Sequence, residues 1–321
     1  MVDRSNRPSA LSASNTSGPQ PSVQSDGDKV TATLPTGDSV EVLLYGATVT
    51  SWKSSQGREN LWLSSEADLT GKKAVRGGIP VVFPVFGPPP KNHATSKLPQ
   101  HGFGRISRWE YLGKSSSESG VLSSSAKEGD DAVRLDFGLT PANLSEESKA
   151  AWPYDFSLQY SVTLGKDGLQ TMLSVRNEGD KPFDFQMLTH TYFAIPDISK
   201  VTITGLSGVK YTDKVLDGTE HDSSTPSLRI EGQVDRVYKS LPQDTTSILV
   251  DNKPYFDVKR DNLSDTVVWN PWKEGAAAIG DYAPKDGYKK MVCVEAGAVN
   301  GWITLEAQDG FEAGQILKSH I

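Results

Sequence analysis

The sequence lacks several features that would place it in large classes of protein. A single cysteine, Cys293, excludes an intramolecular disulfide and a zinc site built from several cysteines. No stretch reaches the roughly 18 consecutive apolar residues of a membrane-spanning helix, and the N-terminus has no apolar core of a signal peptide. From these absences we expect a cytoplasmic protein that does not act at a membrane.

Basic charge is also scarce. Lysine and arginine number 33 against 40 aspartates and glutamates, which gives a formal net charge of -7. A general nucleic-acid binder would carry a basic surface, so we expect no nucleic-acid partner. An acidic chain can still bind an anionic ligand through a local basic pocket, so the positions of single arginines are more informative than the total.

Helical patterns are few, and strand patterns dominate. Apolar and polar residues alternate along residues 157–164, and a turn at 165–168 leads into a second such run at 169–176, which predicts a β-hairpin. Residues 143–152 give the best helical pattern. Further strands are predicted at residues 29–34, 39–44, 47–52, 200–204, 246–250, 266–269 and 302–306. The pattern predicts an all-β fold, a large antiparallel β-sandwich with a few short helices.

Composition changes only once along the chain. Residues 1–26 are rich in serine, proline, asparagine and glycine, a composition that cannot bury enough apolar surface to fold. We expect these residues to form a disordered tail. No comparable change follows, so residues 27–321 are predicted to form one β-sandwich domain, and we expect a monomer.

A histidine and a glutamate within apolar, strand-like runs are the candidates for catalysis. His190 lies in the run 183–195, and Glu295 lies in the run 291–297. Buried glutamates are rare unless paired, and burial raises the carboxyl pKa toward that of a useful acid or base. Two alternatives stay open: a structural histidine on a sheet surface and a glutamate on an edge strand.

Two arginines lie beside glycines. Arg76 precedes Gly77 and Gly78, and Arg105 follows the segment 100–104, which contains Gln100, His101 and two glycines. Glycine lets the backbone approach a ligand closely, and the arginine fork suits phosphate or carboxylate. We therefore expect an anion site here, with surface salt bridges as the alternative.

Several familiar motifs are absent. The glycines at 102 and 104 do not form a dinucleotide fingerprint, because position 107 is serine. The sequence also contains no phosphate-binding loop, no zinc-protease motif and no serine-hydrolase elbow. These observations leave acid–base chemistry on a small molecule as the hypothesis.

Six motifs together resemble the glucose-6-phosphate 1-epimerases, within the aldose-1-epimerase-like superfamily. Each motif is weak alone, but the six occur in the family's order over about residues 28–318. They are RGGIPVVFPVFG at 76–87, QHGFGR at 100–105, LTHTYF at 188–193, VDRVY at 234–238, VWNPW at 268–272 and CVEAG at 293–297.

The resemblance implies a fold and a set of site residues. The expected fold is the galactose-mutarotase-like supersandwich with a concave sugar-binding face. The catalytic pair implied is His190 and Glu295, and the substrate-binding residues implied are Arg76, Gln100, His101, Arg105 and Asp235. Asp235 carries no functional signal of its own in the sequence. Ala296 departs from the family, which more often has proline before the glycine.

The resemblance also implies a reaction, the interconversion of the α and β anomers of hexose 6-phosphates. Glu295 is expected to remove the proton of the anomeric hydroxyl while protonated His190 delivers one to the ring oxygen. A nearby carboxylate is expected to keep His190 protonated. No metal and no cofactor are expected. The alternatives are an epimerase of free sugars and a non-catalytic carbohydrate-binding protein.

Overall fold

The computed structural model describes residues 20–117, 132–166 and 168–321, and it is built almost entirely from β-strands. The strand pairings of these residues are antiparallel, which confirms the predicted all-β fold. They form three sheets. The first sheet has four strands in sequence order: β1 (Ser22–Ser25), β2 (Lys29–Thr33), β3 (Ser39–Leu43) and β4 (Thr48–Lys53).

The nine-stranded sheet follows the alternating patterns of the sequence closely. Its order is β15 (Ser227–Arg229), β12 (Val201–Thr204), β17 (Thr245–Val250), β18 (Lys253–Asp261), β21 (Gly310–Ser319), β9 (Gly168–Asn177), β8 (Phe156–Gly165), β7 (Ala132–Leu139) and β6 (Glu110–Ser117). The predicted hairpin is confirmed as β8 and β9, which pair without a register shift from Phe156 opposite Asn177 to Gly165 opposite Gly168.

The eight-stranded sheet is less regular. Its order is β14 (Thr219–Asp222), β13 (Lys210–Asp213), β16 (Val234–Tyr238), β19 (Asp265–Asn270), β20 (Met291–Leu305), β10 (Phe183–Thr189) and β5 (Val81–Val82), and the short strand β11 (Tyr192–Ala194) also pairs with β20. The pairing of β10 with β20 shifts register between Phe185 and Met187. Such a bulge re-aims the side chains that follow it.

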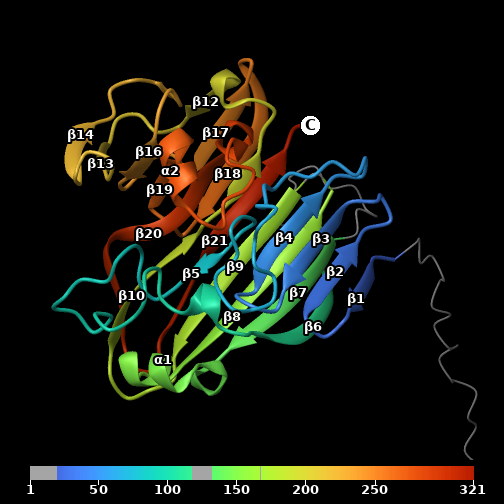
Figure 1. The fold of residues 1–321 in the computed structure, drawn as a ribbon. Coiled ribbons are helices and arrows are strands. Elements are labelled where there is room, and N and C mark those ends of the chain that lie inside the picture. Colours follow the sequence, from blue (N-terminus) through green and yellow to red (C-terminus); the bar gives the residue numbers. More distant parts are fainter. Residues whose placement is uncertain (1–19, 118–131, 167) are drawn as a thin grey trace, which may run out of the picture.

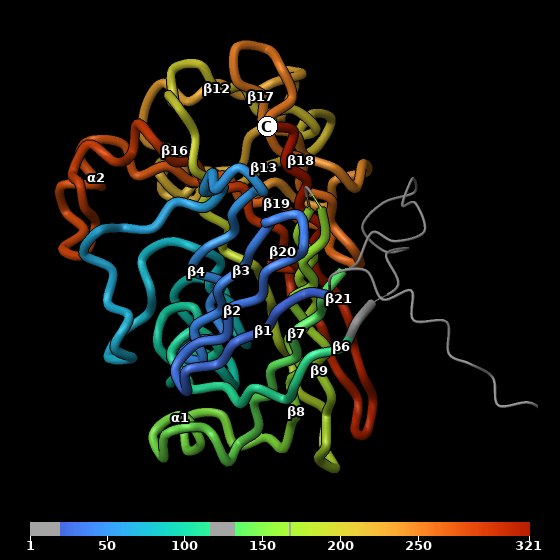
Figure 2. The backbone as a smooth tube through the Cα atoms, turned by 90° about the vertical axis from the view of Figure 1, so that its right-hand side faces the viewer, coloured from blue at the N-terminus to red at the C-terminus, as the bar shows by residue number. Residues whose placement is uncertain are grey.

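The largest of three apolar clusters in the described residues lies between the sheets. It includes Val40 of β3, Phe137 of β7 and Val294 of β20, all buried, so each of the three sheets contributes. In Figure 1 the blue strands β1–β4 lie in front of the green strands β7–β9, and Figure 2 shows the two groups as neighbouring layers. This layering is the sandwich that buries the apolar face of each sheet.

Helices are short in the described residues. They are α1 (Glu146–Ala151), α2 (Trp272–Ala278) and the 3-10 helices Gly104–Ile106, Pro141–Asn143, Ile198–Lys200 and Gly287–Lys290. The Ser145 hydroxyl accepts the Ser148 N–H and caps α1, which is shorter than predicted because Leu144 is extended. None of these helices has the length and apolar character needed to cross a membrane.

The structure departs from three predicted elements. The predicted strand 183–195 is two strands, β10 and β11, with His190 in the gap between them. The predicted strand 302–306 is the end of the 15-residue strand β20. Residues 22–25, assigned to the tail by composition, pair as β1 with β2, and residues 1–19 lie outside the described part, where the tail stays a prediction.

Candidate active site

A cavity of about 460 Å³ opens beside the eight-stranded sheet. All seven residues singled out from the sequence line it, although they come from five separate segments of the chain. The lining residues are Arg76, Phe86, Gly87, Pro88, Gln100, His101, Arg105, His190, Lys214, Asp235, Val267, Trp269, Ile279 and Glu295. The fold therefore brings the predicted residues together.

The strand register explains the floor of the cavity. Asp235 of β16 lies opposite Trp269 of β19, which lies opposite Cys293 of β20. Two residues further along, Val267 lies opposite Glu295. Because side chains two residues apart on a strand share a face, all five side chains lie on one face of the sheet.

His190 reaches this face because the chain leaves the regular sheet at that point. Its backbone N–H donates to the Pro80 carbonyl at 3.0 Å, and the Tyr192 N–H donates to the Gly78 carbonyl at 3.0 Å. The imidazole stacks on the Tyr192 ring, with centroids 4.6 Å apart and planes 10° apart. The Nδ1 atom lies 3.4 Å from Oε1 of Glu295.

The pair is buried and incompletely hydrogen-bonded. Glu295 is 1% exposed and His190 is 9% exposed, and Nδ1 of His190 and Oε2 of Glu295 have no hydrogen-bond partner in the described residues. The 3.4 Å between Nδ1 and Oε1 is therefore within the range of an ion pair, but the two atoms do not form a hydrogen bond. An unpartnered buried polar atom costs about 1–3 kcal/mol, so this arrangement does not serve stability.

Burial also sets the protonation of the pair. It raises the pKa of Glu295, with Asp235 adding to the effect, while Lys214 and Arg105 oppose it. Burial and the neighbouring His101 and Arg105 lower the pKa of His190. Both directions run against the expectation that a carboxylate keeps His190 protonated, and they favour the proton on Glu295 in the ligand-free protein.

His101 has a fixed protonation state and a fixed backbone. Its φ of 69° lies in the left-handed region, and its Nδ1 accepts the Gly87 N–H at 3.2 Å. Burial, with the charges of Arg105 and Lys214, lowers the pKa of His101 to about 2. Because Nδ1 accepts the Gly87 N–H, we assign the proton of the neutral ring to Nε2, which lies 3.4 Å from the side-chain amide of Gln100.

The two arginines have different surroundings. The Arg105 Nη2 donates to the Gln100 carbonyl at 3.1 Å, and its Nε is buried with no partner in the described residues. The Arg76 Nε donates to Asp281 Oδ1 at 3.1 Å, and its Nη1 donates to the Tyr192 hydroxyl at 3.4 Å. Both side chains line the cavity, so both are candidates for an incoming anion.

The glycines beside these arginines serve the packing of the backbone, and not the approach of a ligand as the sequence led us to expect. A Cβ on Gly78 would lie 2.2 Å from the Val49 carbonyl oxygen, and one on Gly102 would lie 2.2 Å from that of Phe83. Both glycines also have positive φ. They hold the arginine-bearing loops against the strands, which places the arginines indirectly.

Sequence reasoning missed Lys214, which lines the same cavity. It follows β13, its backbone N–H donates to the Asp235 carbonyl at 2.8 Å, and its Nζ lies 3.8 Å from the centre of the Phe86 ring. Burial raises the pKa of Asp235, and Lys214 opposes that shift. A single lysine at a strand end carries no sequence signal, so only the fold could identify it.

The pair and Cys293 also have the composition of a metal site. Their ligand atoms lie within 4.8 Å of one another, the one such group found in the described residues. A metal-binding cysteine is a thiolate, whereas burial and the neighbouring Glu295 raise the pKa of the Cys293 thiol. A metal would therefore have to displace the thiol proton on binding, and the absence of a metal stays a prediction.

An antiparallel sandwich with a buried acid–base pair and a cationic cavity wall defines a class of enzymes that move protons on small polar molecules. The chain belongs to the aldose 1-epimerase family, whose sequence model matches residues 28–318. The family explains why six weak motifs occur in order over almost the same residues.

Individual relatives agree with this assignment. A Cenchrus ciliaris protein named "Putative glucose-6-phosphate 1-epimerase" is 35% identical over 271 residues, which are 83% of this chain and 77% of the relative. The Escherichia coli (strain K12) protein of the same name is 36% identical over 254 residues, 78% of this chain and 77% of that protein. The crystal structure of a "putative mutarotase" from Salmonella typhimurium matches with a TM-score of 0.76 and 27% identity, covering 94% of each chain.

Proposed function

We propose that the protein interconverts the α and β anomers of hexose 6-phosphates, with glucose 6-phosphate as the first substrate to test. The observation that carries this proposal is the presence of the pair His190–Glu295 and of Arg76 and Arg105 in one cavity. The pair suits proton transfer at the anomeric centre, and the arginines suit a phosphate at the other end of the sugar. The names of the two relatives support the same substrate class.

The proposed chemistry needs one proton donor and one acceptor. Opening of the ring removes the proton of the anomeric hydroxyl and adds one to the ring oxygen. The aldehyde then rotates about the bond between C1 and C2 and closes on its other face. His190 and Glu295 hold one proton between them, which is the number that this cycle requires.

Both proton arrangements of the pair occur during the cycle. Protonated His190 with ionised Glu295 opens the ring, and the pair is then left as neutral His190 with protonated Glu295. Closure reverses the transfer. The second arrangement is also the one that burial favours in the ligand-free protein. The substrate must therefore favour a proton shift toward His190 before opening.

His190 reaches the substrate through one ring nitrogen. Its Nδ1 is fully buried and faces Glu295. We therefore assign Nε2 as the atom that exchanges a proton with the sugar. Gln100, His101 and Asp235 are assigned to the hydroxyl groups of the sugar, because they offer donors and acceptors in the same cavity.

Anomer exchange measured by NMR tests the proposal. The protein should accelerate exchange of glucose 6-phosphate well above the spontaneous rate and should accelerate exchange of glucose much less. Faster exchange of glucose would favour an epimerase of free sugars. No acceleration of either sugar would leave a carbohydrate-binding protein. A monomeric state and a cytoplasmic location stay predictions.

A further inference from the structure

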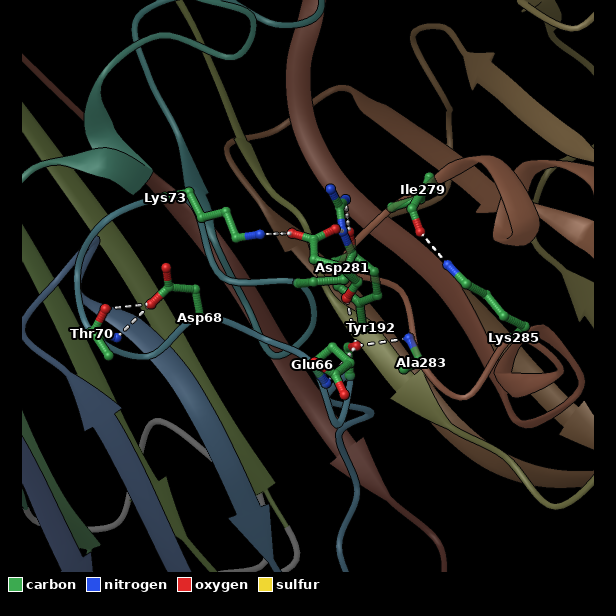
Figure 3. Close-up of polar contacts among 11 residues, drawn as sticks. Glu66, Asp68, Thr70, Lys73, Tyr192, Ile279, Asp281, Ala283 and Lys285 are labelled. Carbon is green, nitrogen blue, oxygen red and sulfur yellow. Dashed lines mark hydrogen bonds and ion pairs between the residues drawn. The ribbon is translucent and has the colours of Figure 1, made fainter.

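The side chain of Arg76 is held by a carboxylate outside the cavity lining. Asp281 follows α2 and accepts a hydrogen bond from the Arg76 Nε at 3.1 Å. The other oxygen of Asp281 lies 3.6 Å from the Lys73 Nζ. Figure 3 shows Asp281 between Lys73 and the region of Tyr192. The side chains of Asp281 and Arg76 are 11% and 26% exposed, whereas that of Lys73 is 55% exposed.

Asp281 is itself anchored by its neighbours. The Ser64 hydroxyl donates to the Asp281 carbonyl at 2.6 Å. The same hydroxyl oxygen accepts the backbone N–H groups of Ala283 at 2.9 Å and Glu66 at 3.2 Å. These bonds, drawn in Figure 3, fasten the segment after α2 to the loop that carries residues 64–66. Asp281 is therefore a fixed point for Arg76.

Two bonds fix the plane of the Arg76 guanidinium. Its Nε is bound to Asp281 and its Nη1 to the Tyr192 hydroxyl. Because the guanidinium is planar and rigid, these two contacts also fix the direction of Nη2, which has no hydrogen-bond partner in the described residues. A pre-ordered arginine loses less conformational entropy when it binds an anion.

The same arginine is connected to the catalytic histidine. Tyr192 accepts a hydrogen bond from Arg76 and stacks on His190 with ring planes 10° apart. The contacts therefore run from Asp281 through Arg76 and Tyr192 to His190. A change at Asp281 should reach both the anion-binding end of the cavity and the imidazole.

We propose that Asp281 is a positioning residue for hexose 6-phosphate recognition, because it holds Arg76 in the orientation that meets the phosphate. The inference rests on the function proposed above. The competing role is simple neutralisation of Arg76. The two roles predict opposite signs, since a neutralising carboxylate competes with the phosphate and its removal would tighten binding.

Kinetics and binding of glucose 6-phosphate in four proteins test the inference: wild type, Asp281→Ala, Asp281→Asn and Lys73→Ala. Asp281→Ala should raise KM and the dissociation constant for glucose 6-phosphate about tenfold, the loss of one charge-assisted hydrogen bond. Asp281→Asn keeps an acceptor for Nε and should stay within about threefold of wild type. Lys73→Ala, which removes the exposed partner of the same carboxylate, should leave both constants unchanged.

Combining Asp281→Ala with Arg76→Ala distinguishes a positioning role of Asp281 from a purely structural one. In that background Asp281→Ala should cause no further loss, because a positioning residue acts only through its arginine. Tighter binding in Asp281→Ala or Asp281→Asn would overturn the inference, as would a full additional loss in the double variant. If Asp281→Ala does not fold, the affinity of Asp281→Asn for glucose 6-phosphate still decides between the two roles, because neutralisation of Arg76 predicts tighter binding by this variant.

The wild-type protein separates the two proposals. If wild type does not accelerate exchange of glucose 6-phosphate, the proposed function fails whatever the variants do. If wild type accelerates exchange, but Asp281→Ala has the same KM and dissociation constant as Lys73→Ala, the proposed function is supported and the proposed role of Asp281 is wrong. Thermal unfolding of each variant identifies losses that come from instability.

Discussion

Two buried carboxylates in the eight-stranded sheet have opposite surroundings. Asp265 at the start of β19 is 0% exposed, and Glu295 of β20 is 1% exposed. Asp265 accepts three backbone N–H groups, from Ser240 at 2.9 Å, Val299 at 2.7 Å and Asn300 at 2.8 Å. Glu295 has one oxygen with no partner in the described residues, and the other lies 3.4 Å from the Nδ1 atom of His190.

This is the difference expected between a structural carboxylate and a functional one. Three backbone N–H groups satisfy the Asp265 carboxylate, so its loss should cost stability. The protein environment leaves Glu295 unsatisfied, and such local departures from good packing are expected at functional sites. Variants of these two carboxylates and of the residues around Glu295 test whether the difference in surroundings reflects a difference in role.

Removal of His190 should have the largest effect, because it takes away the proposed acid of ring opening. We expect His190→Ala to lower kcat for anomer exchange of glucose 6-phosphate about 10²–10⁴-fold, the usual contribution of a positioned acid or base. NMR exchange rates measure the loss, and circular dichroism checks the fold. Exchange at the wild-type rate would make His190 a structural residue.

Removal of Arg105 should have a smaller and more selective effect. The loss of one charge-assisted hydrogen bond, about 1.5–3 kcal/mol, predicts that Arg105→Ala weakens binding of glucose 6-phosphate about 10–100-fold. Glucose binding should change much less. Arg108→Ala is the matched control, because Arg108 is 55% exposed and pairs with Asp28. Equal losses for both sugars would contradict a phosphate site at Arg105.

The smallest effect concerns the pH dependence of stability, which His101 should influence in addition to its proposed contact with the sugar. The pKa of His101 is lowered to about 2 by burial, whereas the unfolded chain binds this proton near pH 6.5. Unfolding is therefore favoured as pH falls from about 6.5 toward 2, by up to about 1.4 kcal/mol per pH unit. His101→Asn, a residue that tolerates positive φ, should flatten this slope in urea unfolding at pH 7, 6 and 5. An unchanged slope would mean that the folded protein protonates His101.

The nine-stranded sheet was the more predictable part of the fold. The hairpin of β8 and β9 depends on local alternation and a short turn, and both are visible in the sequence. The break at His190 depends on hydrogen bonds to carbonyls of residues 78 and 80, about a hundred positions earlier. No local pattern carries that information, so the sequence predicted a continuous strand.

The site was predictable only in part for the same reason. His190 and Glu295 stood out because polar residues are unusual in apolar runs. Asp235 and Lys214 did not, because their place on the cavity floor comes from the register of β13, β16 and β19. The resemblance to a family supplied Asp235, and the structure added Lys214 and Asp281.

The roles of the two carboxylates can be separated by measuring Glu295→Gln and Asp265→Asn side by side. For each variant, the free energy of unfolding and the rate of anomer exchange of glucose 6-phosphate are measured. We expect Glu295→Gln to lose about 10²–10⁴-fold in exchange with unchanged or higher stability. Asp265→Asn should lose about 2 kcal/mol or more of stability and keep most of its exchange rate. The reverse pattern, an active but destabilised Glu295→Gln, would show that Glu295 is a structural carboxylate and contradict the account.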